Sequence, residues 1–229
     1  MLSGAQTSSC ESHVRLGATY LSSAEESEME YLDLSEWDHI HGEFADPGDI
    51  LIIDTETTGL DHGSDEILSL SIYDYNAQQP ILDTFLWPHG LRRWPEAQRI
   101  NHISYEMVRD APSIQQKRDA VNDTICNAKI LIAYNNGFDL PFLRRFGICV
   151  DAPSYELDVM LEFAAYFGEF NSYYGDPMWQ KLSYAAEVCG YTGYDPHISM
   201  EDCKATAFVL DYMTAHPELY GRMVDTIER

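Results

Sequence analysis

Two carboxylates stand two residues apart at the end of an apolar run, an arrangement suited to binding a divalent cation. Asp54 and Glu56 follow Ile50–Ile53. Because strand residues two apart share a face, their carboxylates would lie side by side where the strand meets solvent. Mg²⁺ or Mn²⁺ would keep both ionised despite their repulsion. The alternative is a solvated acidic turn, and Gly59, which permits close backbone approach by a substrate, favours the site.

Two further acids lie where helices are expected to begin. We expect Asp139 to open a helix with Pro141 in its first turn, where a proline is tolerated. Ser199-x-x-Asp202 resembles a capping box before an apolar pattern of helical spacing. Each acid therefore has a structural explanation, through the helix dipole or capping, beside a metal-binding one. At Asp202 the two roles are compatible.

One histidine is a candidate proton acceptor. His197 precedes Asp202 by five positions, in the loop or first turn that leads into the helix. An imidazole with an ordinary pKa of about 6.5 can take a proton from a metal-activated water near neutral pH. A lone histidine is more often an ordinary surface or core residue, and the other seven have no comparable setting. Only the combination with the acids makes His197 a candidate.

The order of these residues resembles the DEDDh 3′-to-5′ exonucleases, a family that includes the proofreading epsilon subunit of bacterial DNA polymerase III. Three segments carry the resemblance: Asp54-Thr55-Glu56-Thr57-Thr58-Gly59-Leu60, Asn135-x-x-Phe138-Asp139 and His197-x-x-x-x-Asp202. A sister group has tyrosine four positions before the final acid, where this chain has Ile198. The resemblance spans roughly residues 50–210.

The resemblance implies two ions, Mg²⁺ or Mn²⁺, and a role for each motif residue. Asp54, Glu56 and Asp202 would hold one ion, Asp54 and Asp139 would hold or orient the other, and His197 would be the general base. One ion would generate the attacking hydroxide and the other would stabilise the departing 3′-oxygen, releasing nucleoside 5′-monophosphates. The motifs also supply candidate substrate-binding residues: Thr57, Leu60, Asn135 and Phe138.

The elements that must position these residues are predicted from hydrophobic patterning. Strands are expected at 50–53, 67–75, 81–87, 129–133 and 155–157, and helices at 113–127, 139–146, 159–167, 181–188, 201–214 and 218–227. Antiparallel strands followed by strand–helix alternation indicate an α/β sheet flanked by helices. The resemblance implies an RNase H-like fold with a central five-stranded mixed sheet. We expect an acidic, flexible or weakly helical extension at 1–46 and an exonuclease domain at 47–229.

The charge balance is unusual for a protein that binds phosphates. The 229 residues include 38 acidic and 14 basic ones, a net charge of −24. This argues against a broad electrostatic grip on long nucleic acid and predicts distributive action that depends on short contacts or a partner. Basic residues cluster in two segments, and neither cluster is assigned a firm role. The first contains Arg92, Arg93 and Arg99, and the second contains Arg144 and Arg145.

Other features place the chain broadly. Five scattered cysteines without a Cys-x-x-Cys pair are expected to be reduced thiols, and no apolar run is long enough for a signal peptide or a bilayer span. We therefore expect a soluble, cytoplasmic protein with no membrane partner. An aromatic-rich segment, 163–179, could stack splayed bases, although such residues are more often core.

Three functional hypotheses remain open. The first is a metal-dependent exonuclease acting on single-stranded 3′ ends, with DNA slightly preferred over the RNA that RNA-trimming relatives and oligoribonuclease would process. A non-catalytic nucleic-acid or protein-binding module on the same fold is the second, and the complete set of motif acids argues against it. An acidic metal-binding or nucleic-acid-mimic protein would explain the charge but not the ordered motifs. The acidic N-terminal extension is a possible site for a protein partner.

Overall fold

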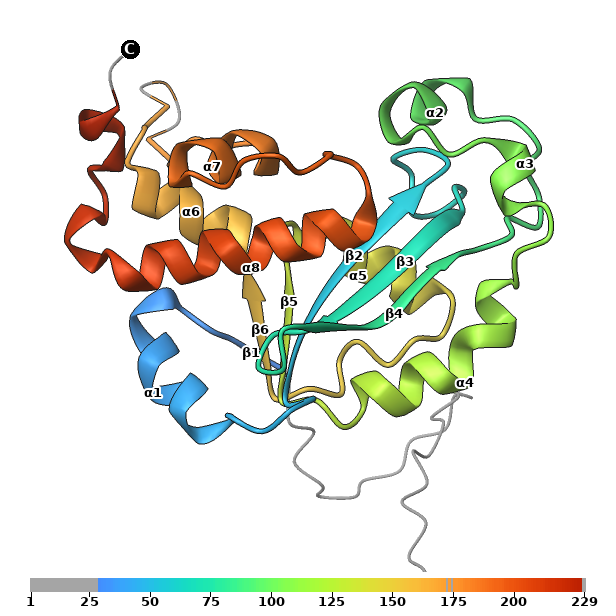
Figure 1. Ribbon diagram of the computed structural model, residues 1–229, viewed down its shortest axis with the longest axis horizontal. Helices are drawn as coiled ribbons and strands as arrows, with labels where there is room; N and C mark the ends of the chain where they lie inside the picture. Colours follow the sequence, from blue (N-terminus) through green and yellow to red (C-terminus); the bar gives the residue numbers. More distant parts are fainter. Residues whose placement is uncertain (1–28, 172, 174, 228–229) are drawn as a thin grey trace, which may run out of the picture.

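A single mixed sheet organises the part of the chain that the computed structural model describes, which is residues 29–171, 173 and 175–227. Its strand order is β1-β6-β5-β2-β3-β4, with helices on both faces (Figure 1). The strands are β1 Glu30–Tyr31, β2 Ile50–Thr57, β3 Ile67–Asp74, β4 Gln79–Phe85, β5 Ile130–Ala133 and β6 Tyr155–Asp158. Strand β2 lies between β5, to which it is parallel, and β3, to which it is antiparallel. The predicted α/β architecture is confirmed.

The predicted number of strands, five, was wrong by one. The sixth strand, β1, comes from the segment predicted to be a flexible or weakly helical extension, and it pairs in parallel with β6. Only Glu30 and Tyr31 form it, and both are exposed at the sheet edge. So short a segment carries no apolar alternation, so hydrophobic patterning could not reveal it. Further along the predicted extension, the structure has a 3₁₀ turn at Leu34–Glu36 and a short helix at Trp37–Glu43, and residues 1–28 lie outside the described residues.

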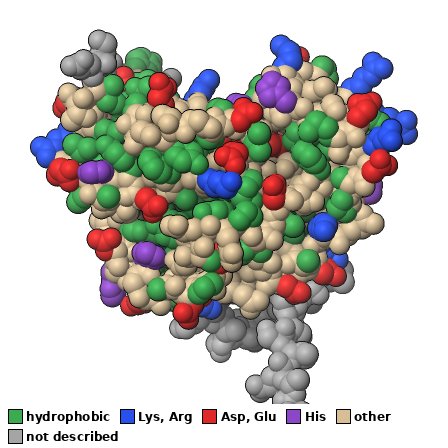
Figure 2. Space-filling model, in the orientation of Figure 1, with side chains coloured by type: hydrophobic (Ala, Val, Ile, Leu, Met, Phe, Trp, Pro, Cys, Tyr) green, Lys and Arg blue, Asp and Glu red, His purple; other side chains and the backbone are tan. Residues whose placement is uncertain are grey.

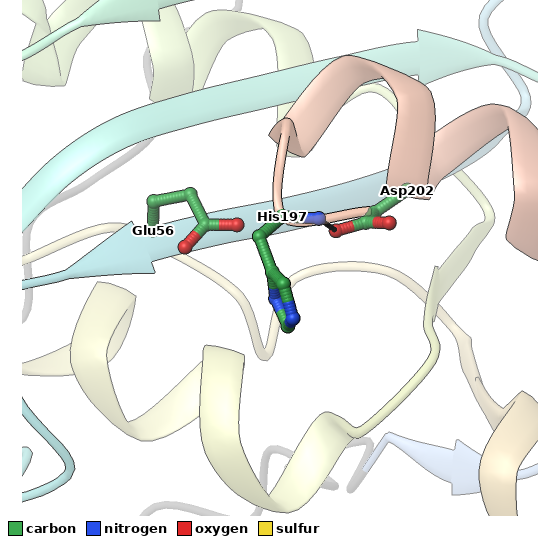
Figure 3. A group of neighbouring side chains, drawn as sticks. All are labelled: Glu56, His197 and Asp202. Atoms are coloured by element: carbon green, nitrogen blue, oxygen red, sulfur yellow. Dashed lines mark hydrogen bonds between the residues drawn. The ribbon is translucent and has the colours of Figure 1, made fainter. Parts of the chain in front are cut away.

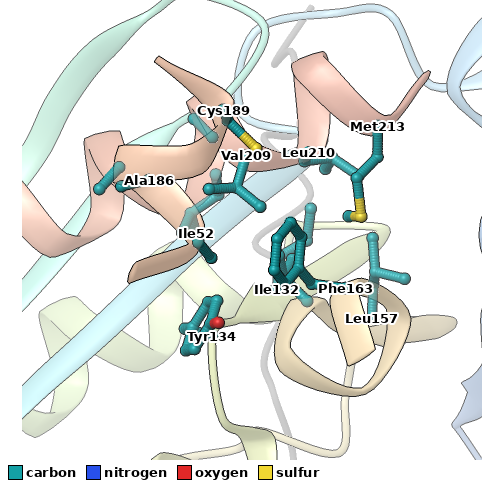
Figure 4. Packing of buried hydrophobic residues seen from close by; sticks show 14 of the residues in the cluster. Ile52, Ile132, Tyr134, Leu157, Phe163, Ala186, Cys189, Val209, Leu210 and Met213 are labelled. Atoms are coloured by element: carbon teal, nitrogen blue, oxygen red, sulfur yellow. The ribbon is translucent and has the colours of Figure 1, made fainter. Parts of the chain in front are cut away.

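Helices cover the sheet through two apolar layers. Alternate residues of β2 face opposite sides. Ile52 belongs to the layer under α6 and α8 (Figure 4), and Ile53 belongs to the layer under α4 and α5. Both residues are fully buried. The α-helices are α1 Trp37–Glu43, α2 Pro95–Asn101, α3 Tyr105–Val108, α4 Ile114–Ile125, α5 Asn136–Arg145, α6 Val159–Phe167, α7 Leu182–Cys189 and α8 Ser199–Ala215.

The predicted helix at 218–227 was wrong. Two short 3₁₀ turns occupy this region, η2 Pro217–Leu219 and η3 Met223–Thr226; a third, η1 Leu34–Glu36, precedes α1. Gly221, between η2 and η3, has φ 73°, which a helix does not allow, and its N–H donates to the Tyr166 carbonyl. A β-carbon on Gly168, at the end of α6, would lie 2.2 Å from the Gly221 oxygen. This close backbone contact replaces the helix that local pattern alone suggested.

Helix α5 also differs from its prediction, because it begins at Asn136 rather than at Asp139. Asp139 therefore lies at the end of the first turn, and Pro141 lies inside the helix. A proline there leaves the carbonyl four residues earlier, that of Gly137, without its helical N–H donor.

Within the described residues, no helix is long and apolar enough to cross a membrane.

Candidate active site

The carboxylates of the first motif lie within strand β2 rather than at its solvent end. The strand continues past its apolar run to Thr57, and Asp54 and Glu56 pair with Ser71 and Ser69 of β3. Glu56 is only 9% exposed and Asp54 is half-buried, so the expectation that both carboxylates lie where the strand meets solvent was wrong for Glu56. A shift of register between Glu56 and Thr57 ends regular pairing at this point. Such irregularities bend a strand and re-aim its side chains.

Asp139 approaches Asp54 from helix α5. Thr55 lies between Asp54 and Glu56 in β2. It donates from its backbone N–H and its hydroxyl to Asp139 Oδ1, at 3.0 and 2.6 Å. Both residues are buried. Two donors on one oxygen hold the Asp139 carboxylate in place and leave its Oδ2 for another partner. Strand β2 thereby positions the acid of a helix 84 residues away in sequence.

Helix α8 brings the third motif to the same place. Its first residue, Ser199, has its hydroxyl 2.7 and 2.8 Å from the hydroxyls of Ser69 and Ser71, the β3 residues that pair with Glu56 and Asp54. The capping-box interpretation was therefore wrong, because the N-cap is Ile198 and Ser199 bonds across to the sheet. The hydroxyl contacts dock the start of α8 against β3, the strand that pairs with the acid-bearing β2.

His197 and Asp202 are joined directly. The backbone N–H of His197 donates to Asp202 Oδ2 at 2.9 Å, and both side chains lie beside Glu56 (Figure 3). His197 has φ 69°, a left-handed conformation that a histidine adopts at a cost in free energy of about 1–3 kcal/mol. Ligand atoms of Glu56, His197 and Asp202 all lie within 4.8 Å of one another. The loop is thus held in a strained turn that brings the imidazole to the acids.

The acids repel one another in a poorly solvated space. Burial raises the pKa of Asp54, and Asp139, Asp202 and Glu56 raise it further. Burial and the charge of Asp202 raise the pKa of Glu56 to about 8. Mainly through burial, the pKa values of Asp139 and Asp202 rise to about 7. Folding therefore concentrates four carboxyl groups that cannot all ionise without a compensating positive charge.

A divalent cation would supply that charge. Asp54 Oδ2 is buried and, among the described residues, has no hydrogen-bond partner. A buried carboxylate oxygen left without a donor is costly unless a cation or an ordered water meets it. The donor set is oxygen-rich, with carboxylates from β2, α5 and α8, which suits Mg²⁺ or Mn²⁺. These residues fit a divalent metal site.

The imidazole of His197 is suited to accept a proton. Partial shielding of the ring lowers its pKa, and the neighbouring His102 and Lys181 lower it further, against the opposing charge of Asp195. A pKa below the ordinary value keeps the ring neutral at pH 7, with a free nitrogen lone pair. The residue as a whole is exposed, so the ring remains reachable from solvent.

The four predicted substrate-binding residues occupy different settings. Leu60 is 85% exposed just beyond β2, whereas Thr57 is buried with its hydroxyl donating to the Gly59 carbonyl. Asn135 is the N-cap of α5, and Phe138 packs against the apolar layer under α5. The need for glycine at position 59 is explained within the protein, without a substrate, because a β-carbon there would lie 2.4 Å from the Asp65 carboxylate.

Several supporting residues had no assigned role in the sequence interpretation. Thr55 lies inside the first motif, but its contact with Asp139 depends on how β2 and α5 pack. Asn101, the last residue of α2, donates from its side-chain amide to the Thr57 carbonyl at 3.1 Å. Asp158 caps α6 and accepts the backbone N–H of Asn136, the first residue of α5. Only Asp158, an acid at a strand end, left a signal that patterning could find.

The aromatic-rich segment divides into two parts. Phe163, Tyr166 and Phe167 are fully or almost fully buried in the layer beneath α6, which confirms the core interpretation for them. Phe170 and Trp179, in the loop that follows, are 59% and 68% exposed. The stacking hypothesis for bases therefore remains a prediction for the loop alone.

Comparisons with known proteins agree with this arrangement. The model of the RNase T family, described as exonuclease, matches residues 51–210, which include all three motifs. A PolC-type DNA polymerase III of Caldanaerobacter subterraneus subsp. tengcongensis is 27% identical over 166 residues, 70% of this chain. One from Staphylococcus saprophyticus is 26% identical over 175 residues, 75% of this chain. The match covers only 11% and 12% of those two polymerases.

Solved structures share the fold. A zinc-bound complex of E. coli exonuclease I with single-stranded DNA has a TM-score of 0.61 at 15% identity, covering 77% of this chain and 42% of the other. A complex of E. coli exonuclease I with a dT13 oligonucleotide also has a TM-score of 0.61, at 18% identity, covering 74% and 42%. This likeness confirms the RNase H-like arrangement of sheet and helices. At such low identity it is evidence of the fold alone.

Proposed function

Because this chain belongs to the RNase T exonuclease family, we propose that it removes nucleotides one at a time from single-stranded 3′ ends and releases nucleoside 5′-monophosphates. The observation that carries the proposal is the convergence of the motif residues: acids from β2, α5 and α8 crowd together, and Asp54 Oδ2 is buried without a hydrogen-bond donor. This is the charge arrangement that a metal-dependent phosphodiesterase requires.

The proposed roles follow from the contacts of each side chain. Asp54, Glu56 and Asp202 would hold one divalent ion, and Asp54 with Asp139 the other, with Thr55 fixing the Asp139 carboxylate through two hydrogen bonds. Two bound ions would supply positive charge beside the attacking water and the departing 3′-oxygen. The neutral imidazole of His197 would accept the proton of the attacking water, and its backbone bond to Asp202 holds it beside Glu56.

The terminal nucleotide would lie beside the end of β2. Leu60, the last residue of the first motif, projects into solvent just beyond β2, where an apolar side chain can wedge against a base. Asn101 donates a hydrogen bond to the Thr57 carbonyl, which stabilises the position of the strand end that the nucleotide would contact. Asn135, the N-cap of α5, and Phe138, which directly precedes Asp139, would also lie near the terminal nucleotide.

DNA is the proposed substrate. The similar proteins include PolC-type DNA polymerases and exonuclease I structures whose descriptions name single-stranded DNA. Discrimination between RNA and DNA depends on contacts with the 2′-hydroxyl. An exoribonuclease activity is therefore the outcome against which the DNA proposal must be tested.

The decisive experiment follows 5′-labelled single-stranded DNA, duplex DNA and single-stranded RNA with Mg²⁺ or Mn²⁺. Wild-type protein should shorten single-stranded DNA from its 3′ end, and Asp54→Asn and His197→Ala should each lose most of this activity. Asp119→Asn and His89→Ala, at exposed positions on α4 and in a surface loop, are the matched controls and should remain active. If no substrate loses 3′ nucleotides in a metal-dependent way, the enzyme proposal is refuted; faster loss from RNA would reassign the substrate.

A further inference from the structure

A cavity beside α2 concentrates positive charge in a chain of net charge −24. It is open, about 600 Å³ in volume, and its lining includes Arg92, Arg93, Gln98 and Tyr105. Figure 2 shows Lys and Arg side chains gathered at the upper right of the molecule, over the region of α2 and α3 in Figure 1. One carboxylate, that of Glu106, also lines the cavity, so two guanidinium groups face a single acid.

The two arginines are available to bind an anion. Both are exposed, and among the residues that the structure describes neither forms an ion pair with a carboxylate. Most other arginines are engaged: Arg118 contacts Asp119, and Arg144 contacts Asp151. Guanidinium groups without an acidic partner are suited to phosphate, which they can bind through paired hydrogen bonds.

An aromatic ring lies against the same cavity. Tyr105 is half-buried, and Trp87 holds it in an edge-to-face contact with ring centroids 5.4 Å apart. Trp94, which also lines the cavity, is fixed by a hydrogen bond from its indole N–H to the Ile103 carbonyl. A held aromatic ring beside unpaired guanidinium groups is the combination by which proteins bind single-stranded nucleic acid without reading its sequence.

The cavity is coupled to the candidate active site through α2. The helix begins beside the cavity and ends at Asn101, whose amide binds the carbonyl of Thr57 at the end of β2. Seven helical residues span about 10 Å, a length that a few nucleotides of a strand can cover. A strand with its 3′ end at the acids can therefore reach the cavity with a phosphate a few nucleotides away.

We propose that Arg92, Arg93 and Tyr105 form a second contact for single-stranded nucleic acid, binding the backbone and a base on the 5′ side of the scissile nucleotide. The inference rests on the proposed function and extends it. It also explains how so acidic a protein retains its substrate: the positive charge is placed at one short contact instead of along a broad surface. Substrates too short to reach this contact should not benefit from it.

The test compares the variant Arg92→Ala/Arg93→Ala with Arg118→Ala/Arg222→Ala, which removes the same charge from exposed sites elsewhere. Binding of labelled dT20, followed by fluorescence anisotropy with Ca²⁺ in place of Mg²⁺, should weaken by about tenfold or more only in the first variant. The slope of log affinity against log salt should fall by about 1.4, corresponding to two lost phosphate contacts on a single strand.

Hydrolysis separates this contact from the active site. In the cavity variant KM for dT20 should rise, while kcat/KM for the small ester thymidine 5′-(4-nitrophenyl phosphate) should stay at the wild-type value. Tyr105→Phe should retain dT20 affinity and Tyr105→Leu should lose part of it, because only the former keeps the ring. Equal dT20 affinity in the two double variants would overturn the inference. If no substrate is hydrolysed, the proposed function fails, but the binding experiment still decides whether the cavity holds a strand.

Discussion

Replacing Glu56 by glutamine should stabilise the metal-free protein while abolishing hydrolysis. Burial and Asp202 raise the pKa of Glu56 from 4.5 to about 8. The unfolded chain ionises Glu56 above about pH 4.5, whereas the folded protein keeps it largely protonated until about pH 8. The folded state binds more protons in this interval, so its stability falls as the pH rises through it. Glutamine removes that loss because it has no proton to release.

The expected gain in the free energy of unfolding follows from the interval between the ordinary pKa of glutamate, 4.5, and pH 7, at about 1.4 kcal/mol per pH unit. Folding at pH 7 therefore costs about 3 kcal/mol at Glu56, and Glu56→Gln should raise the melting temperature in EDTA by about 6–12 °C. At pH 4, where Glu56 is mostly protonated in both states, the two proteins should melt alike.

Thermal unfolding followed by circular dichroism in EDTA measures this difference, with Glu187→Gln as the control at an exposed position of α7. The control should change the melting temperature little at either pH. Two results would refute the electrostatic account of the acid cluster. One is a Glu56→Gln protein that melts at a lower temperature than wild type at pH 7, and the other is an equal rise in its melting temperature at pH 4 and pH 7.

Three further predictions concern the site and the fold. Mg²⁺ at about 100 times its dissociation constant should raise the free energy of unfolding by about 2.7 kcal/mol in calorimetry, with weaker binding at pH 6 than at pH 8 because protons compete for carboxyls of raised pKa; no shift at any Mg²⁺ concentration would contradict the site. His197→Gln should lower kcat by about 10²–10⁴ yet keep the Mg²⁺-induced rise in melting temperature, and loss of that rise would make His197 a metal ligand instead of a base. The β-carbon of Gly168→Ala would lie 2.2 Å from the Gly221 oxygen, whereas Gly193, which also has a positive φ, has open space around it. In urea titrations Gly168→Ala should lower the free energy of unfolding by about 2 kcal/mol more than Gly193→Ala. Equal losses would contradict this prediction, because they would mean that the Gly221 backbone moves away at little cost.

Local patterning predicted the elements that are long and regularly apolar. The run Ile50–Ile53 identified β2, and Val159–Phe167 was predicted to the residue, because burial on a sheet or against one face of a helix imposes a period that the sequence records. The edge strand Glu30–Tyr31 and the 3₁₀ turns around Gly221 escaped prediction. Their conformations depend on partners distant in sequence, β6 and the Gly168 backbone, so no local period marks them.

The candidate site shows the same division between local signal and tertiary context. Motif order identified Asp54, Asp139 and Asp202 as partners, and the structure brings them together. Motif order did not identify the residues that hold these acids in place. Thr55 binds Asp139, and Ser199 docks α8 on β3 instead of capping α8. A threonine or serine side chain has many possible partners, and packing selects among them.

The acidity of the chain and its proposed substrate are compatible if positive charge is supplied locally. At the acid cluster, bound divalent ions would reverse the sign of the site that the phosphodiester meets, since such ions are often the largest charges in their surroundings. At the cavity, Arg92 and Arg93 would bind the strand a few nucleotides away. The remaining surface would repel a polyanion, so a strand that leaves these two contacts would not be held nearby. The two proposals together therefore predict distributive shortening, and a trap-challenge assay with excess unlabelled strand would contradict them jointly if long products disappeared in a single processive run.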